Sequence, residues 1–481
     1  MQKKYEKSPS ALVAMIPLAV LAFLLFLVIK AFGSDSIAGG SQIALLSASS
    51  ICVMLSMGLY GVSWSRLEGE IIENIRSSAS AIIILLLIGS IAGTWMVSGV
   101  VPTLICYGLE VLHPSWFLAA CCLICAGVSL MTGSSWTTIA TIGVALMGIG
   151  RALGFEEGWI AGAIISGAYF GDKLSLLSDT TVLASSTVGV PVFTHIRYML
   201  YTTLPSMVIA LAVFLGASLL HEAEPQGEVL LFTEQLRETF HITPWLLLVP
   251  LVTGLLIARK LPAIVTLFVA TLLASLAFPL FQPELVKEVA GEATGEGFLQ
   301  GFKGVLTAVF GATSIDAGSE TVNALISTRG MSGMMNTVWL ILCAMSFGGV
   351  MTGSGMLAAL TNRFVRWVHR PRMAVSATVG AGLFFNLATA DQYISIILTG
   401  RLFRELYRRL GLEERLLSRT VEDSATVTSV LIPWNSCGMT QATVLGVATF
   451  TYLPYCVFNY LSPIFSILVA LIGYKIYRRH E

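Results

Sequence analysis

Acidic side chains flanked by hydroxyl residues occur in two distant segments of the chain. The first segment contains Asp172, Ser178, Asp179, Thr180 and Thr181. The second contains Glu422, Asp423, Ser424, Thr426 and, a little further on, Asn435. Carboxylate, hydroxyl and amide oxygens replace the hydration shell of a hard cation, and removal from water favours the protonated form of a carboxyl group. These residue types indicate a site where a small cation and H⁺ compete.

Asp179 and Asp423 are the strongest candidates for contact with the cation, because each is flanked by hydroxyl residues. If the second segment is helical, Glu422 and Thr426 share one face and Asp423 points about 100° away from it. We therefore expect only one of these two adjacent acids to face the site. An alternative reading of Asp172 is a neutral pair with Lys173 that caps a loop.

Two shorter polar segments accompany the acidic ones. Thr132-Gly-Ser-Ser-Trp-Thr-Thr138 offers the hydroxyls of Ser134, Ser135 and Thr137. Thr389-Ala-Asp-Gln-Tyr-Ile-Ser395 offers Asp391 and Gln392. The alternative is that these hydroxyls bond their own helix backbone, and that the nearby tryptophans serve only packing.

The elements that position these residues are expected to be membrane helices. Of the 481 residues, 55% are hydrophobic and 12% are charged, whereas about 25% are charged in an ordinary soluble domain. Apolar stretches such as residues 11–29, 41–62 and 79–100 reach the roughly 20 residues that a spanning helix needs. We expect an all-α polytopic membrane protein with about 11 to 13 passes, several of them broken or re-entrant.

The placement of charges supports this interpretation. An ionisable side chain inside a membrane costs at least about 2.5 to 3.5 kcal/mol on insertion scales, so it indicates function or pairing. Non-helical backbone at that depth must be buried in protein or line a watery cavity. The formal net charge is zero, and no basic run is interleaved with aromatic residues, so a nucleic-acid partner is excluded.

Lysine and arginine set the expected orientation through the positive-inside rule. The N-terminus with Lys3, Lys4 and Lys7 and the C-terminal tail with Lys475, Arg478 and Arg479 are both expected in the cytoplasm. The first apolar stretch is too long for a signal-peptide core of about 7 to 15 residues, and we interpret it as a retained helix. A bacterial inner membrane is the expected location.

An internal repeat is indicated by glycine spacing. Gly93 and Gly349, like Gly99 and Gly355, are 256 residues apart. The polar segments follow in the same order, with Thr389 found 257 residues after Thr132 and Asp423 found 244 residues after Asp179. Arginines after the second glycine helix give it the opposite direction, so the repeats are inverted. Inverted repeats place the site at their interface near the midplane.

These observations divide the chain into five ranges. Residues 1–76 form N-terminal membrane helices, 77–220 the first repeat, 221–243 an external linker, 244–330 connecting helices and 331–481 the second repeat. Six arginines from Arg401 to Arg419 are expected on a cytoplasmic amphipathic connector. Cys121, Cys122 and Cys125 lack partners for a zinc site, so we expect them to pack in a helix, and we expect no cofactor.

The motifs resemble the NhaC-type Na⁺/H⁺ antiporter family across both halves. They are Gly167-Ala-Tyr-Phe-Gly-Asp-Lys-Leu-Ser-Leu-Leu-Ser-Asp-Thr-Thr181, Thr132-Gly-Ser-Ser-Trp136, Gly330-Met-Ser-Gly-Met-Met335, Ala390-Asp-Gln-Tyr393, Glu422-Asp-Ser424 and Ile432-Pro-Trp-Asn435. The resemblance implies an inverted-repeat fold, sodium coupling and a homodimer. It favours Asp172, Ser178, Asp179 and Thr180 in one half, and Asp391, Gln392, Glu422, Asp423 and Asn435 in the other.

The chain departs from the family pattern at Leu176, Thr137 and Val182, where proline, glycine and asparagine are usual. Our main hypothesis is exchange of Na⁺ for H⁺ across the bilayer, with Na⁺ at Asp179 and Asp423. The alternative is Na⁺- or H⁺-coupled transport of a small organic solute, an organic acid or amino acid, as in malate/lactate exchange. A membrane-embedded enzyme would need a nucleophile with a base, or a metal set such as His-Glu-x-x-His, and neither is present.

Overall fold

The computed structural model describes residues 9–32, 39–221, 226–259, 261–291, 297–319, 322–323, 326–360 and 370–474. The described helices up to residue 220 are α1 (Ala11–Phe32), α2 (Gly40–Tyr60), α3 (Trp64–Ser77), α4 (Ala79–Val97), α5 (Val100–Val111), α6 (Phe117–Thr132), α7 (Ser135–Thr138), α8 (Val144–Ala152), α9 (Glu157–Leu174), α10 (Asp179–Val188) and α11 (Val192–Leu220).

The helices that follow are α12 (Gln226–Thr239), α13 (Leu248–Ala258), α14 (Ala263–Phe281), α15 (Pro283–Ala290), α16 (Phe298–Phe310), α18 (Met335–Gly353), α20 (Pro371–Thr389), α21 (Gln392–Arg409), α22 (Glu414–Val421), α23 (Ser436–Leu445), α24 (Thr449–Tyr452) and α25 (Val457–Ile472). Two π-helical turns, Ile139–Gly143 and Glu422–Thr426, interrupt the regular helices. The described residues contain no β-strand, only one isolated bridge between Thr313 and Thr328.

The chain is an all-α polytopic membrane protein, as expected. Seven of the described helices are long and apolar enough to cross a membrane, or up to ten if each of three bent helix pairs is one span. One such pair is α9 and α10, which meet at 48°. The expected number of passes was higher, because broken segments such as α7 and α8 are too short to qualify alone.

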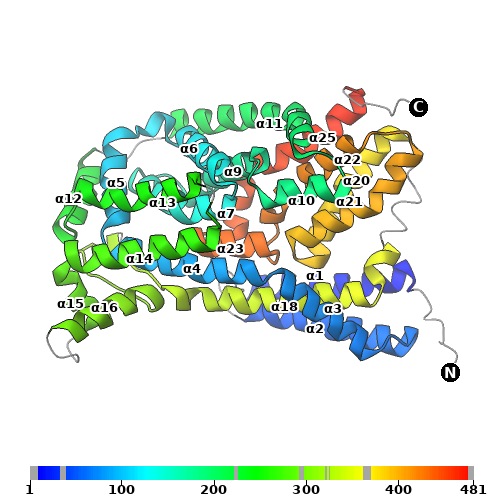
Figure 1. The fold of residues 1–481 in the computed structure, drawn as a ribbon, viewed down its shortest axis with the longest axis horizontal. Coiled ribbons are helices and arrows are strands. Elements are labelled where there is room, and N and C mark those ends of the chain that lie inside the picture. The colour runs from blue at the N-terminus through cyan, green and yellow to red at the C-terminus, as the bar shows by residue number, and fades with distance from the viewer. Residues whose placement is uncertain are drawn as a thin grey trace.

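The helices lie in two layers in Figure 1, with α4, α14, α16 and α18 below α9, α10 and α11. Within the lower layer α4 packs on α14 and α16, and α18 packs on α2 and α3. Above it α6 packs on α9, and α10 packs on α21. The segments around Ser134, Asp179 and Tyr393 line a cavity together with residues of α4.

Two helix breaks share the same construction. The first follows α6, where Gly133 is left-handed (φ 67°) and the Ser134 side chain accepts a hydrogen bond from Thr137 N. The second follows α20, where Ala390 is left-handed (φ 57°) and the Asp391 side chain accepts from Ile394 N. In each case a left-handed residue ends one helix and a polar side chain caps the next.

The left-handed residues of the two breaks, Gly133 and Ala390, are 257 residues apart. The same spacing recurs elsewhere in the chain. Helix α10 with its left-handed Gly189 and helix α23 with its left-handed Gly446 have bounds that differ by 257 at each end. The ion pairs Arg151–Glu157 (2.8 Å) and Arg408–Glu414 (3.7 Å) differ by the same number. Helices α4 and α18 differ by 256 at both ends.

This register corrects one pairing that the sequence suggested. Asp179 is the first residue of α10 and corresponds to Ser436, the first residue of α23, so its alignment with Asp423 at a spacing of 244 is wrong. The acidic residues Asp179 and Asp423 therefore do not correspond to each other in the recurrence.

Some expectations concern residues outside the described ranges. The charged ends with Lys3, Lys4, Lys7, Lys475, Arg478 and Arg479 lie there, so the structure does not bear on the predicted orientation. In the range 221–243, expected to be a linker, residues 226–239 form α12, while residues 222–225 lie outside the described part.

Candidate functional site

The break between α9 and α10 places two acidic residues close together. Helix α9 ends at Leu174 and α10 begins at Asp179, with Ser178 Oγ accepting a hydrogen bond from Thr181 N (3.3 Å). Asp172 lies in the last turn of α9 and Asp179 in the first turn of α10. Asp179 thus lies at the end of α10 where the helix dipole is positive.

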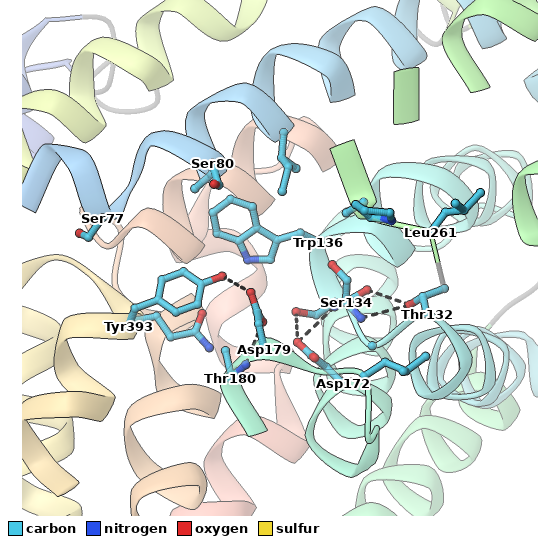
Figure 2. Close-up of a pocket in the computed structure, with 18 residues that line it drawn as sticks. Ser77, Ser80, Thr132, Ser134, Trp136, Asp172, Asp179, Thr180, Leu261 and Tyr393 are labelled. Carbon is cyan, nitrogen blue, oxygen red and sulfur yellow. Dashed lines mark hydrogen bonds between the residues drawn. The ribbon is translucent and has the colours of Figure 1, made fainter. Parts of the chain in front are cut away.

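A cavity of about 470 Å³ opens between this break and helix α4. Figure 2 shows Trp136, Tyr393, Asp179 and Asp172 around it, with Ser80 on the side of α4. The lining residues are Ser77, Ser80, Ala81, Ile84, Thr132, Gly133, Ser134, Ser135, Trp136, Asp172, Leu177, Asp179, Thr180, Leu261, Pro262, Ala263, Gln392 and Tyr393. Among these described residues there is no lysine, arginine or histidine, and both charged residues are acidic.

Asp179 is exposed to the cavity and is held from two sides. The Tyr393 hydroxyl donates to Asp179 Oδ2 (2.7 Å), and Thr180 N donates to Asp179 Oδ1 (2.8 Å). Tyr393 belongs to α21, after the second helix break. One hydrogen bond thus connects the two broken segments across the cavity, as the dashed line in Figure 2 shows.

Asp172 lies deeper, with 4% of its surface exposed. Its Oδ2 accepts hydrogen bonds from the backbone N (3.2 Å) and the Oγ (2.7 Å) of Ser135, at the start of α7. Its other oxygen, Oδ1, has no hydrogen-bond partner among the described residues. A buried carboxylate oxygen without a donor is costly, and a bound cation or proton would satisfy it.

Glu422 extends the acidic site into the second half of the chain. Thr180 Oγ1 donates to Glu422 Oε1 (3.4 Å) and is itself 2.9 Å from Ser178 Oγ. The carboxyl groups of Glu422 and Asp172 are near enough to interact electrostatically. In the described structure neither Glu422 Oε2 nor Thr426 Oγ1 has a hydrogen-bond partner. Glu422 and Asp423 are both fully buried, but only Glu422 contacts Thr180, so it is the one of the two adjacent acids that faces this site.

Asp423 points to a different group of residues. Its Oδ1 accepts hydrogen bonds from Lys173 Nζ, Thr202 Oγ1 (3.1 Å) and Ser462 Oγ (3.1 Å). Arg419 Nε lies 3.6 Å from its Oδ2, and all three charged side chains are fully buried. Asp423 is not among the residues that line the cavity.

Two expectations are corrected by this cluster. Lys173 does not neutralise its neighbour Asp172, because its ammonium group pairs with Asp423. Arg419 is not part of an exposed connector, because it is buried and lies over the ring of Tyr198 (4.9 Å). Its position four residues before Asp423 was the sequence signal for this pair.

The second break is built from residues that bond one another. Asp391 Oδ2 accepts from Ser436 Oγ (3.3 Å) and Gln392 Oε1 from Cys437 Sγ (2.6 Å). Asn435 donates to the Asn386 backbone oxygen (3.1 Å) and caps α23 by accepting from Cys437 N. Of this group only Gln392 lines the cavity, so Asp391 and Asn435 hold the break in shape.

Three further candidates bond mainly to neighbouring parts of the backbone or to a capping residue. Ser424 Oγ donates to Thr420 O (2.6 Å), and Thr181 Oγ1 donates to Lys173 O (3.1 Å). Thr137 Oγ1 donates to Ser134 Oγ (3.1 Å). Within the first short segment, Ser134 and Ser135 line the cavity whereas Thr137 does not.

Three other residues, Leu176, Val182 and Asp316, do not line the cavity. Val182 is 42% exposed and, like Leu176, does not line the cavity. Asp316 is exposed, and a hydrogen bond from Asn323 (2.8 Å) holds its pKa below the usual range. All eight cysteines are buried and free, and the described residues contain no group of three or more His, Cys, Asp or Glu residues that would hold a metal ion.

Sequence reasoning did not assign several residues that build the site. Tyr393 and Trp136 belong to motifs that were noticed, yet no spacing argument predicted that Tyr393 would contact Asp179. Thr202 and Ser462 carry no signal of their own, because hydroxyl residues are common in membrane helices.

Comparisons with known proteins agree with this architecture. The profile of the Na⁺/H⁺ antiporter family matches residues 167–474. The chain is 35% identical to the Na⁺/H⁺ antiporter NhaC of Bacillus subtilis, over 87% of this chain and 90% of that protein. It is 35% identical to the malate-2H⁺/Na⁺-lactate antiporter of the same organism, over 90% of this chain and 89% of that protein. It is 33% identical to the arginine/ornithine antiporter ArcD of Halobacterium salinarum, over 98% of this chain and 94% of that protein.

Proposed function

The chain belongs to the Na⁺/H⁺ antiporter family, and we propose that it exchanges Na⁺ for H⁺ across its membrane at the carboxyl groups of Asp172 and Asp179. The observation that carries this proposal is the position of both acids at one helix break. They line the same cavity, and one oxygen of Asp172 lacks a donor in the described structure.

The proposed ion site continues from the cavity into the protein. Asp179 is at the exposed end, Asp172 lies deeper, and Thr180 connects them to the buried Glu422. These residues offer carboxylate and hydroxyl oxygens, which are the ligands that a hard cation takes in place of water. Na⁺ and H⁺ then bind alternately to the same oxygens, because a carboxylate that holds one of these cations cannot bind the other.

In this proposal Asp423 does not bind Na⁺, although its sequence context suggested that it would. Its charge is already balanced by Lys173 and Arg419, so a Na⁺ ion would have to displace a buried ammonium group. We assign Na⁺ to Asp179 and Asp172, and we assign Asp423 to holding Lys173 between the two halves. With Asp423 ionised the three-residue cluster carries a formal charge of +1, and an ionised Glu422 beside it would bring the sum to zero.

The recurrence of equivalent helices and helix breaks in the two halves supports an inverted repeat as the basis of alternating access. In this proposal the two broken segments close the cavity from opposite sides of the membrane in turn, and the Tyr393–Asp179 hydrogen bond is made in one of the two states. A homodimer in an inner membrane, with both termini in the cytoplasm, completes the proposal.

Coupled transport of an organic solute is the second candidate. Two of the relatives are named for exchange of organic solutes, and the cavity of about 470 Å³ falls in the range of about 300 to 1,000 Å³ that is usual for small-molecule pockets. All three relatives described above are named as antiporters, which supports a transporter over an enzyme.

Purified protein in proteoliposomes with an internal pH-sensitive dye tests the proposal. Imposed gradients of Na⁺, Li⁺ and K⁺ are compared at equal ionic strength, with empty liposomes as the control. H⁺ movement that requires Na⁺ or Li⁺, without an organic solute, is the expected result. H⁺ movement that is absent under every cation, or equal for K⁺ and Na⁺, would overturn the proposed function.

A further inference from the structure

The cavity is much larger than a sodium ion requires. A hard cation such as Ca²⁺ lies about 2.3 to 2.6 Å from its ligand oxygens, whereas the cavity has a volume of about 470 Å³. Most of the space in front of Asp172 and Asp179 is therefore free for a second, larger ligand.

The charges on the cavity wall define the chemical class of that ligand. Both charged residues on the wall, Asp172 and Asp179, are acidic, and the described lining residues include no basic side chain. Lys173, the only basic residue nearby in sequence, is turned away and paired with Asp423. An organic anion would meet two carboxylates without a counter-charge, while an organic cation would find two partners.

Two independent features of the wall favour an ammonium group. Asp172 is 4% exposed and its Oδ1 has no hydrogen-bond donor among the described residues, so it is free to accept from an N–H group. Trp136 and Tyr393 line the same space, and aromatic faces attract organic cations within about 6 Å of the ring.

We propose that this cavity binds a small organic cation with one or two ammonium groups, in competition with Na⁺. The proposal rests on the proposed function, because it places the organic cation at the carboxyl groups that also bind Na⁺. Neutral and anionic molecules of the same length are excluded by the same carboxylates.

A matched series of four-carbon compounds tests the charge requirement. The compounds are 1,4-diaminobutane, 1,4-butanediol and succinate, which carry positive, neutral and negative ends on the same chain. Each is added to purified full-length protein at constant ionic strength, and binding is measured by calorimetry together with the Na⁺ concentration that gives half-maximal H⁺ movement in proteoliposomes.

Binding of diaminobutane that rises in affinity as Na⁺ is removed, with no binding of the other two compounds, is the expected result. Diaminobutane should also raise the Na⁺ concentration needed for half-maximal H⁺ movement. Absence of diaminobutane binding, or equal binding of the diol or succinate, would overturn the inference. Na⁺-driven H⁺ movement without diaminobutane binding refutes only this inference, whereas diaminobutane binding without Na⁺-driven H⁺ movement refutes only the proposed function.

A pair of variants at Ser80 tests the location. Ser80 lines the cavity from α4, is exposed, and is not a proposed ligand of Na⁺. Ser80→Phe fills part of the cavity and should weaken diaminobutane binding at least about tenfold, equivalent to about 1.4 kcal/mol. Ser80→Ala removes only the hydroxyl and should bind within about twofold of the original protein.

Unchanged diaminobutane affinity in Ser80→Phe would place the ligand elsewhere and overturn the inference. If Ser80→Phe fails to fold, Ser77→Phe fills the same cavity from the end of α3 and is judged by the same outcomes.

Discussion

Lys173 follows Asp172 directly in the chain, yet its ammonium group is paired with Asp423, 250 residues away, in a pair without solvent exposure. The contact joins α9 in the first half to the π-helical turn at Glu422–Thr426 in the second. Arg419 Nε lies 3.6 Å from the other oxygen of the same carboxylate. A single acidic side chain is thus the ion-pair partner of two buried cations.

Removal of Asp423 should destabilise the protein more than removal of Lys173. Asp423→Asn removes the carboxylate that pairs with both buried cations, whereas Lys173→Met leaves Asp423 with Arg419. Breaking a buried pair costs about 3 to 5 kcal/mol, and we expect Asp423→Asn at the upper end of that range. Thermal unfolding in detergent, followed by tryptophan fluorescence, measures the order. A Lys173→Met variant less stable than Asp423→Asn would refute the proposed charge balance.

Tyr393→Phe should weaken the apparent affinity for Na⁺ without unfolding the protein. The substitution removes the 2.7 Å hydrogen bond that orients Asp179. A hydrogen bond to a charged group contributes about 1.5 to 3 kcal/mol, so the Na⁺ concentration for half-maximal exchange should rise roughly tenfold or more. Tyr455→Phe, whose hydroxyl makes a longer 3.5 Å contact with Glu156, is the matched control. Equal Na⁺ dependence in all three proteins would contradict the role of Tyr393.

The two helix breaks should respond in opposite ways to an exchange of glycine and alanine. Ala390 is the one non-glycine residue with positive φ in the described structure, which costs an L-residue about 1 to 2 kcal/mol. Glycine relieves that strain but adds conformational freedom to the unfolded chain, which costs about 0.4 to 1 kcal/mol of stability. Ala390→Gly should therefore be neutral or stabilise the protein by up to about 1.6 kcal/mol.

Gly133→Ala should destabilise, because the added Cβ would lie 2.6 Å from the backbone carbon of Leu177 in addition to the strain at φ 67°. Melting temperatures of the two variants give the comparison. Stabilisation by Gly133→Ala, or clear destabilisation by Ala390→Gly, would show that the breaks are not built alike.

The fold class could be predicted from sequence because long apolar stretches leave few alternatives. The 256-residue spacing of Gly99 and Gly355 recurs in the bounds of α4 and α18, and both glycines are left-handed just after these helices. The predicted correspondence of Asp179 with Asp423 was wrong because it was based on their similar chemistry. Only the bounds of the helices show which residues correspond in the two halves. The partners of Lys173 could not be predicted from the sequence. A contact between distant parts of the chain depends on how the helices pack and leaves no local pattern in the sequence.

An inverted repeat predicts that equivalent loops lie on opposite sides of the membrane. Glu156 and Glu413 directly precede α9 and α22 and occupy equivalent positions in the recurrence. All eight native cysteines are buried, so a single cysteine at either position should dominate labelling by a membrane-impermeant maleimide. Glu156→Cys and Glu413→Cys should be labelled from opposite sides of sealed vesicles, with the original protein as the background. Labelling of both from the same side would contradict the inverted arrangement.

The central claim is that Asp172 and Asp179 hold the cation, and equilibrium binding of radioactive Na⁺ to purified protein tests it most directly. Asp172→Asn and Asp179→Asn are compared with Asp316→Asn, which changes an exposed aspartate that does not line the cavity. We predict that the original protein and Asp316→Asn bind Na⁺ and release it on acidification, and that the other two variants, folded, do not bind it. Na⁺ binding of unchanged affinity in both Asp172→Asn and Asp179→Asn would contradict the account.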